Sequence, residues 1–169
     1  MIAQNKKIKA ENVAIIGLMV ALIEAAKFAL LGLPNIELTS FFIIVFSVYF
    51  GKKVFFAIPA FILVEGAVFG FGIWWFMYLY TWPLLAVISL IFSKVRSVYV
   101  YASISALFGF SFGLLCSLSY VFIWDIGQIF AWWIAGIPWD IIHGVSNFII
   151  MLVLYKPVMK ILKKAEEKR

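Results

Sequence analysis

Three polar residues near the C-terminal end of the chain, Asp140, His143 and Asn147, have the types and the spacing of a small-molecule site. On an α-helix, offsets of 0, 3 and 7 residues bring their side chains within about 60° of one another. Tryptophans precede them and an apolar run follows them. A polar stripe at the end of a membrane-spanning helix, beneath aromatic rings, is typical of the floor of a binding pocket. The alternative is that the three side chains make hydrogen bonds that pack helices together.

Asp140 has a further interpretation as a helix cap. It follows Pro138 by two residues, and a Gly-Ile-Pro sequence predicts a break in the chain there. We therefore expect Asp140 in the first turn of a new helix, where a carboxylate accepts hydrogen bonds from free N–H groups and is favoured by the helix dipole. The stretch from Ala131 to Pro138 is then a re-entrant or interfacial segment.

Aromatic side chains form a second candidate set. Trp75, Tyr78 and Trp82 lie at offsets of 0, 3 and 7 residues and share one helix face. All seven tryptophans fall in segments that the charge pattern described below places on the outer side of a membrane. An interfacial belt should mark both sides, so this excess indicates that some rings line a cavity and bind a ligand with a large ring surface. Interfacial anchoring is the alternative for each single tryptophan.

Several catalytic and metal-binding classes are excluded. The sequence contains no G-x-x-x-x-G-K-[ST], no H-E-x-x-H and no G-x-S-x-G. His143 is the only histidine and Cys116 the only cysteine, so a multi-histidine metal site, a cysteine metal site and a disulfide framework are all unavailable. We expect no enzymatic activity, no metal and no cofactor of the chain's own.

The composition predicts a single-domain, all-α integral membrane protein. Hydrophobic residues make up 66% of the chain and charged residues 13%, whereas soluble domains carry about 25% charged residues. A chain of 169 residues holds about six spans of about 20 residues with short loops. The predicted spans are residues 13–31, 37–50, 54–69, 74–92, 98–123 and 139–155.

Basic residues predict the orientation of these spans. They cluster at the N-terminus (Lys6, Lys7 and Lys9) and after the second, fourth and sixth spans. Those four places share one side of a six-span bundle, and the opposite loops contain no lysine or arginine. The positive-inside rule therefore places both termini in the cytoplasm, with the chain in a plasma membrane. Because the net charge of +6 is distributed at the membrane boundary, we expect it to face the lipid bilayer, and we expect no nucleic-acid partner.

Three charged residues interrupt the apolar spans. Glu24 and Lys27 lie near the middle of the first span and Glu65 near the middle of the third. Such residues usually face the bundle and pair, because a charge at a helix centre costs roughly 2.5–3.5 kcal/mol. Lys27 can pair with Glu24 on its own helix or with Glu65. The main interpretation is an ion pair that fixes helix register, and the alternative is a proton or sodium relay.

Small residues recur every four positions along the first span, at Gly17, Ala21, Ala25 and Ala29. This spacing forms one seam over which another helix can approach closely. The pattern alone leaves two interpretations open. The seam packs against a neighbouring span of this chain, or it is the docking face for another protein's helix.

The chain resembles the substrate-specificity subunits of energy-coupling-factor vitamin transporters, with cobalamin-type members the nearest. The resemblance covers essentially the whole chain. It rests on six short spans, the A-x-x-x-A pattern of the first span, and the stretches LPNIE, FGFGIWWFMYLYTWP and AWWIAGIPWDIIHGVSN at residues 33–37, 69–83 and 131–147. The candidate substrate-binding residues are Asn35, Glu37, Trp75, Tyr78, Trp82, Trp132, Asp140, His143 and Asn147.

The resemblance implies a mechanism. The subunit binds a vitamin at its outer face, associates with a membrane coupling protein and two ATPases that use ATP, and topples in the membrane to release the vitamin inward. In that family the small-residue seam of the first span is the docking face for the coupling protein. The resemblance therefore implies that Gly17, Ala21, Ala25 and Ala29 form this face here. Glu24 and Lys27 depart from the family's apolar first span. The alternatives are a subunit for riboflavin, folate or pantothenate, an ion-coupled secondary transporter, and a membrane scaffold.

Overall fold

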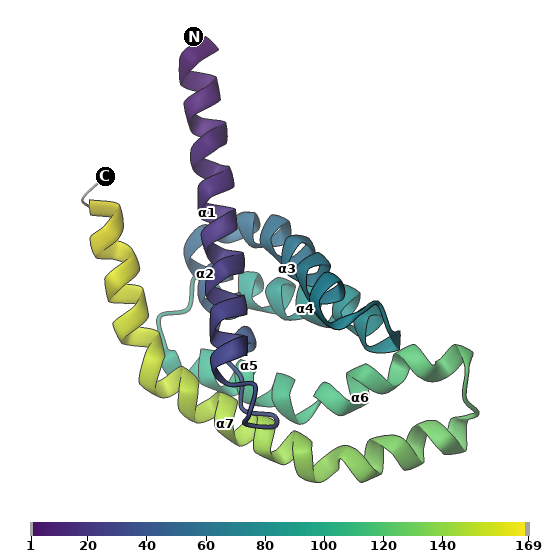
Figure 1. Ribbon diagram of the computed structural model, residues 1–169. Coiled ribbons are helices and arrows are strands. Elements are labelled where there is room, and N and C mark those ends of the chain that lie inside the picture. The colour runs from purple at the N-terminus through teal and green to yellow at the C-terminus, as the bar shows by residue number, and fades with distance from the viewer. Residues whose placement is uncertain (1, 168–169) are drawn as a thin grey trace.

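The computed structural model describes the backbone of residues 2–167 and the side chains of residues 10–167. The described chain is helical and contains no strand, which confirms the predicted all-α class (Figure 1). The side chains of Lys6, Lys7 and Lys9, which contributed to the predicted orientation, lie outside the described residues. The elements are α1 (Ile2–Ala29), α2 (Thr39–Phe50), the 3₁₀ turn η1 (Gly51–Lys53), α3 (Val54–Phe69), α4 (Ile73–Ile91), α5 (Val98–Phe110), α6 (Phe112–Ser117), the 3₁₀ turn η2 (Leu118–Phe122) and α7 (Ile126–Glu167).

Four helical segments of the described chain are long and apolar enough to cross a membrane, and a fifth is added if α5 and its bent continuation through η2 count as one span. The bend between those two helices is 46°. The prediction was six. The difference arises at α2 and α3, because η1 joins them into one apolar segment of 31 residues. α2 alone has 12 residues, about 18 Å of helix, which is less than the roughly 30 Å of a bilayer core.

α7 is one helix of 42 residues that runs through both Pro138 and Pro157. The expected break before Asp140 is therefore wrong, and the stretch from Ala131 to Pro138 is part of this helix and not a re-entrant segment. Proline removes one backbone hydrogen bond from a helix, and apolar membrane helices tolerate this because their neighbours stabilise the freed groups. α7 begins at Ile126, so Asp140 lies in the helix interior and does not cap the first turn.

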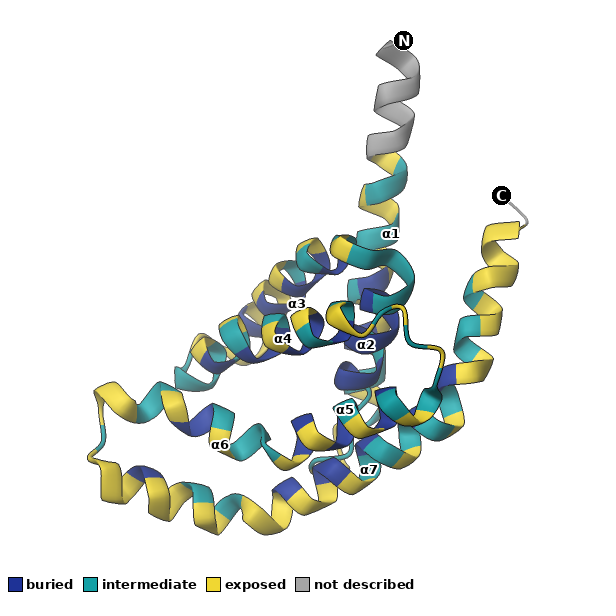
Figure 2. Cartoon of the chain, turned by 180° about the vertical axis from the view of Figure 1, so that it is seen from behind, coloured by how far each residue is buried: buried dark blue, intermediate teal, exposed yellow. Residues whose placement is uncertain are grey.

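α2 lies at the centre of the bundle and packs against α1, α3, α4, α5 and α7. Nearly all of its residues from Thr39 to Ser47 are buried, and Figure 2 shows it largely in the buried colour. The hydrophobic core joins its side chains to those of the neighbouring helices. Neighbouring helices pack around α2 and fix its position. The loop of residues 30–38, which leads into α2, is therefore fixed where it joins the bundle.

Two glycines set the distance between α5 and α7. A Cβ atom added to Gly109 would lie 2.8 Å from the Cα atom of Gly144, so the two backbones are in direct contact there. Glycine is the residue that allows membrane helices to approach this closely. This contact fixes the part of α7 that carries His143.

Candidate functional site

A cavity of ≈ 220 Å³ lies where the loop of residues 30–38 meets α1, α4, α6 and α7. We call it the His143 cavity. Five of the nine candidate substrate-binding residues line it, although they come from three separate parts of the chain. The polar and aromatic side chains of this lining are Lys27, Asn35, Glu37, Thr39, Tyr78, Trp82, Phe112 and His143.

The loop of residues 30–38 is fixed at both sides of Asn35. Asn35 has a φ of 58°, in the left-handed region that asparagine tolerates better than most residues. Its carbonyl oxygen accepts a hydrogen bond of 3.2 Å from the Ser146 hydroxyl of α7. Glu37 then accepts a hydrogen bond of 2.9 Å from the backbone N–H of Ser40, in the first turn of α2. This part of the cavity wall is therefore held by contacts to two helices.

Glu37 and His143 form the polar centre of the cavity. His143 Nε2 lies 3.1 Å from Glu37 Oε1, and the imidazole is almost fully buried. Glu37 therefore joins the loop to α2 through Ser40 and to α7 through His143.

Aromatic rings form the wall beside this polar centre. The Trp82 ring lies 5.3 Å from that of Tyr78 and 5.6 Å from that of Phe112, measured between centroids. The Phe112 ring is also 5.0 Å from the His143 imidazole. These spacings are those of favourable edge and offset ring contacts. The cavity thus offers a ring ligand both stacking surfaces and a charged hydrogen-bonding group.

Two buried nitrogen atoms of the lining residues have no hydrogen-bond partner, namely Nε1 of Trp82 and Nδ1 of His143. An unpaired polar atom in a protein interior costs about 1–3 kcal/mol, and each such atom in a native structure needs an explanation. A bound ligand that accepts from the indole and pairs with the imidazole would provide one. Buried oxygen atoms of Glu24, Asp140 and Asn147 are likewise without a partner, so such atoms do not by themselves mark a ligand site.

Lys27 also lines the cavity, which the sequence interpretation did not foresee. Its ammonium group forms an ion pair with Glu65 and lies 3.3 Å from the Tyr78 hydroxyl. It is also within 5.6 Å of three ring centroids, those of Phe61, Phe69 and Tyr78. Of the two predicted partners, the structure therefore selects Glu65. The signal that could have placed Lys27 in the site is its position in the last turn of α1, three residues before the loop that carries Glu37.

Glu24 remains apart from this ion pair. Both of its carboxylate oxygens are buried and have no hydrogen-bond partner. The pair between Lys27 and Glu65 joins α1 to α3 and therefore fits the predicted role in helix register.

Four candidate residues do not reach the cavity. Asp140 accepts a hydrogen bond of 2.9 Å from the Gly113 N–H, and Asn147 donates one of 3.3 Å to the Ser105 carbonyl. Both therefore pack α7 against α5 and α6, as in the alternative interpretation of the polar stripe. The other two are Trp75, which donates to the Ile62 carbonyl at 2.8 Å, and Trp132, which lies beside the Tyr120 ring.

The small-residue seam of α1 faces away from the bundle. Gly17, Ala21, Ala25 and Ala29 are all exposed, and a Cβ atom added to Gly17 would meet no atom within 4 Å. Among the described residues, no helix of this chain covers the seam. Packing within the chain, one of its two interpretations, therefore does not account for it.

No protein-family model matches the chain, and neither a curated protein nor a solved structure matches it. Among the described residues, no group of three or more histidine, cysteine, aspartate or glutamate side chains is placed to hold a metal ion. The geometry of the His143 cavity and of the α1 seam therefore carries the functional argument.

Proposed function

We propose that this protein is a vitamin-binding subunit of an ATP-driven importer of the energy-coupling-factor type, in a bacterial plasma membrane. The observation that carries the proposal is the convergence of Asn35, Glu37, Tyr78, Trp82 and His143 on one cavity. Pockets that combine ring surfaces with a few convergent polar groups are the usual form of small-molecule sites. The chain itself needs no cofactor in this scheme, because partner ATPases use the ATP.

The size of the cavity favours a compact ring-bearing vitamin. Its volume of ≈ 220 Å³ is below the roughly 300–1,000 Å³ of pockets that enclose drug-sized ligands. A corrinoid such as cobalamin is much larger and would require α4 and α6 to separate. This observation favours a subunit for a smaller vitamin over the cobalamin-type resemblance.

The proposed topology has six crossings. α2 runs from Thr39 at the His143 cavity to Tyr49, which hydrogen-bonds to the C-terminal tail at Glu166. α3 returns from η1 to Glu65, which pairs with Lys27 beside the same cavity. The two short helices thus run in opposite directions between the two ends of the bundle. This supports counting them as two crossings of a thin, locally adapted bilayer.

The proposed orientation places both termini in the cytoplasm and the His143 cavity at the outer side. Figure 1 shows that the N-terminal end of α1 and the C-terminal end of α7 lie toward the same end of the molecule. Basic residues from the loop between α4 and α5 and from the end of α7 line one cavity at that end. This clustering agrees with the positive-inside rule.

The exposed α1 seam is the proposed docking face for the coupling protein. Small side chains allow backbone contact between membrane helices, and Gly17, Ala21, Ala25 and Ala29 present such a surface outward. Association there would connect ligand binding to the two ATPases. An ion-coupled secondary transporter or a scaffold would have no such partners, so co-purification of ATPases with the tagged protein separates the two functions.

The Ala25→Trp variant should lose vitamin uptake and keep ligand binding. Ala25 is exposed, so an indole at this position is accommodated in the isolated protein but prevents close approach of a partner helix. Uptake by cells that contain the whole transporter, and ligand binding by the purified subunit, measure the two effects. The control is Val87→Trp, which adds similar bulk at an exposed site of α4. If Ala25→Trp retains full uptake, or loses binding together with uptake, the docking assignment is wrong.

A further inference from the structure

A second and larger cavity lies at the opposite end of the bundle from the His143 cavity. Its volume is ≈ 1200 Å³, and it lies between the end of α2, the loop between α4 and α5, and the last four turns of α7. Helix geometry places it far from the first site, because Lys160 follows His143 by 17 residues, or about 25 Å along α7. We call it the basic cavity. Its cationic lining residues are Lys94, Arg96, Lys156, Lys160, Lys163 and Lys164.

The positive charge of the basic cavity is not neutralised within the protein. Glu167 is the one carboxylate that lines it, and among the described residues none of the six cations forms an ion pair. A neighbouring carboxylate, Glu166, accepts a hydrogen bond of 2.6 Å from Tyr49. That contact fixes the end of α7 to α2, so the cations lie around a defined space. Six cations with one carboxylate predict an anionic ligand.

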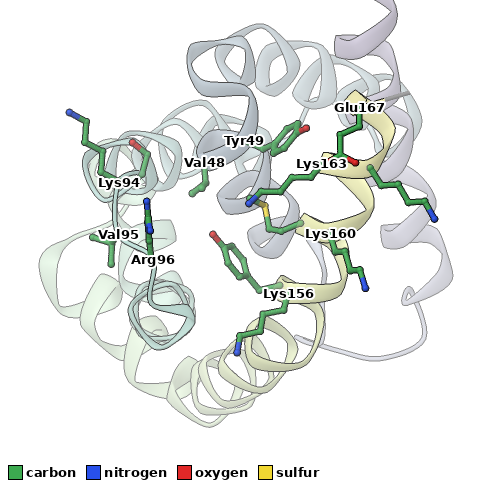
Figure 3. A pocket seen from close by; sticks show the side chains of 13 residues that line it. Val48, Tyr49, Lys94, Val95, Arg96, Lys156, Lys160, Lys163 and Glu167 are labelled. Atoms are coloured by element: carbon green, nitrogen blue, oxygen red, sulfur yellow. The ribbon is translucent and has the colours of Figure 1, made fainter. Parts of the chain in front are cut away.

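Figure 3 shows how the cations lie around this space. Lys163 extends from α7 into the gap between α7 and the loop that carries Arg96, while the Lys94 amine points away. Arg96 and Lys163 thus come from two elements that are far apart in the sequence. An anionic group between them would be held from both sides, and guanidinium and ammonium groups both suit phosphate oxygens.

Much of the remaining lining is apolar or aromatic. Val48, Val95, Met159 and Tyr155 line the same cavity. A free phosphate ion uses only the cations, whereas a phospholipid has an anionic phosphate and an apolar glycerol and acyl region beside it. The volume also exceeds what a single phosphate group fills. Basic pockets between helices at the cytoplasmic side of membrane proteins are a known form of anionic lipid site.

We propose that the basic cavity binds the headgroup of an anionic phospholipid of the cytoplasmic leaflet. The phosphate lies between Arg96 and Lys163, and the glycerol region packs on Val48 and Met159. The site fixes the end of α7 against the loop between α4 and α5. The proposal rests on the proposed orientation of the chain but not on the ligand of the His143 cavity, so a wrong assignment of that ligand leaves it standing.

The test measures binding of phosphatidylglycerol to the full-length protein in detergent, with phosphatidylcholine of the same acyl chains as the neutral lipid. Retained lipid is counted by native mass spectrometry over a lipid titration. The protein should bind phosphatidylglycerol in preference to phosphatidylcholine. Each basic residue near an anionic lipid surface contributes about 1 kcal/mol, which corresponds to about fivefold in affinity. The double variant Arg96→Gln with Lys163→Gln should therefore weaken the binding of phosphatidylglycerol about 25-fold. The matched control is Lys52→Gln with Lys53→Gln, which removes two charges of η1 outside the cavity.

Each outcome decides the proposal. A selective loss in the Arg96 and Lys163 variant, with the control within about twofold of the wild type, supports it. Equal binding of the two lipids overturns it and leaves a docking surface for an acidic protein segment. An equal loss in both variants also overturns it, because the effect is then one of net charge. A third arm adds inorganic phosphate, and displacement of the lipid by millimolar phosphate would identify a site for the free ion instead.

Discussion

Lys27→Met should lower the free energy of unfolding by about 3–5 kcal/mol, the range for removing one partner of a buried ion pair. The reason is the carboxylate that remains. Glu65 is 1% exposed, pairs with Lys27 and has a second oxygen without a hydrogen-bond partner. Methionine retains the length of the side chain but leaves that charge unpaired in an apolar bundle. Denaturation in mixed micelles of increasing sodium dodecyl sulfate fraction measures the change.

The double variant Lys27→Met with Glu65→Gln is the matched control. It removes both charges, so it should recover most of the lost stability, because replacing a whole buried pair is often nearly neutral. Glu24→Gln serves as a second comparison, because it changes a buried carboxylate of α1 that forms no hydrogen bond with Lys27 or Glu65. If the single variant is as stable as the wild type, or if the double variant is no better than the single one, the pair does not have the structural role assigned to it.

His143→Ala should weaken vitamin binding by roughly 10- to 100-fold, which corresponds to about 1–3 kcal/mol for a lost hydrogen bond in a buried site. The imidazole lines the cavity, orients Glu37 at 3.1 Å and has a free Nδ1. Its loss removes a ligand contact and leaves the Glu37 carboxylate less well held. Quenching of tryptophan fluorescence during titration with a vitamin panel gives the affinity, since Trp82 lines the same cavity.

Asn147→Ala is the control on the same helix. Asn147 lies one turn further along α7, is buried and donates to the Ser105 carbonyl of α5. Its loss should lower thermal stability and leave the affinity unchanged. Equal effects of the two substitutions on affinity would show that the polar stripe acts as one unit. Unchanged affinity in the His143 variant would contradict the assignment of the cavity as the binding site.

The sequence predicted those features that depend on local periodicity. Composition was sufficient for an all-α chain with helices long and apolar enough to cross a membrane. Helix spacing placed Tyr78 and Trp82 on one face of α4, where both line the cavity. The same reasoning failed for Asp140 and Asn147. Their offsets from His143 put them within reach of α5 and α6, and only the packing of those helices determines which polar group meets a carbonyl and which meets a cavity.

Other features depend on contacts between distant segments. Pro138 predicted a break in α7, yet the helix continues through it, and α7 packs against α5 and α6. Lys27 had two possible partners, and the position of α3 beside α1 selected Glu65. The basic residues after the fourth and sixth spans indicated orientation alone. That Arg96 and Lys163 share a cavity follows only from the folded arrangement.

The most direct test of the central claim is the small molecule that the purified protein retains. The protein is isolated from a bacterial membrane, and its bound small molecules are identified by mass spectrometry beside the His143→Ala and Asn147→Ala variants. The wild type and the Asn147 variant should both retain one compact ring-bearing vitamin at close to one molecule per chain, and the His143 variant should retain far less. Equal retention by all three proteins, or no retained molecule together with unchanged tryptophan fluorescence across the vitamin panel, would contradict a vitamin site at the His143 cavity.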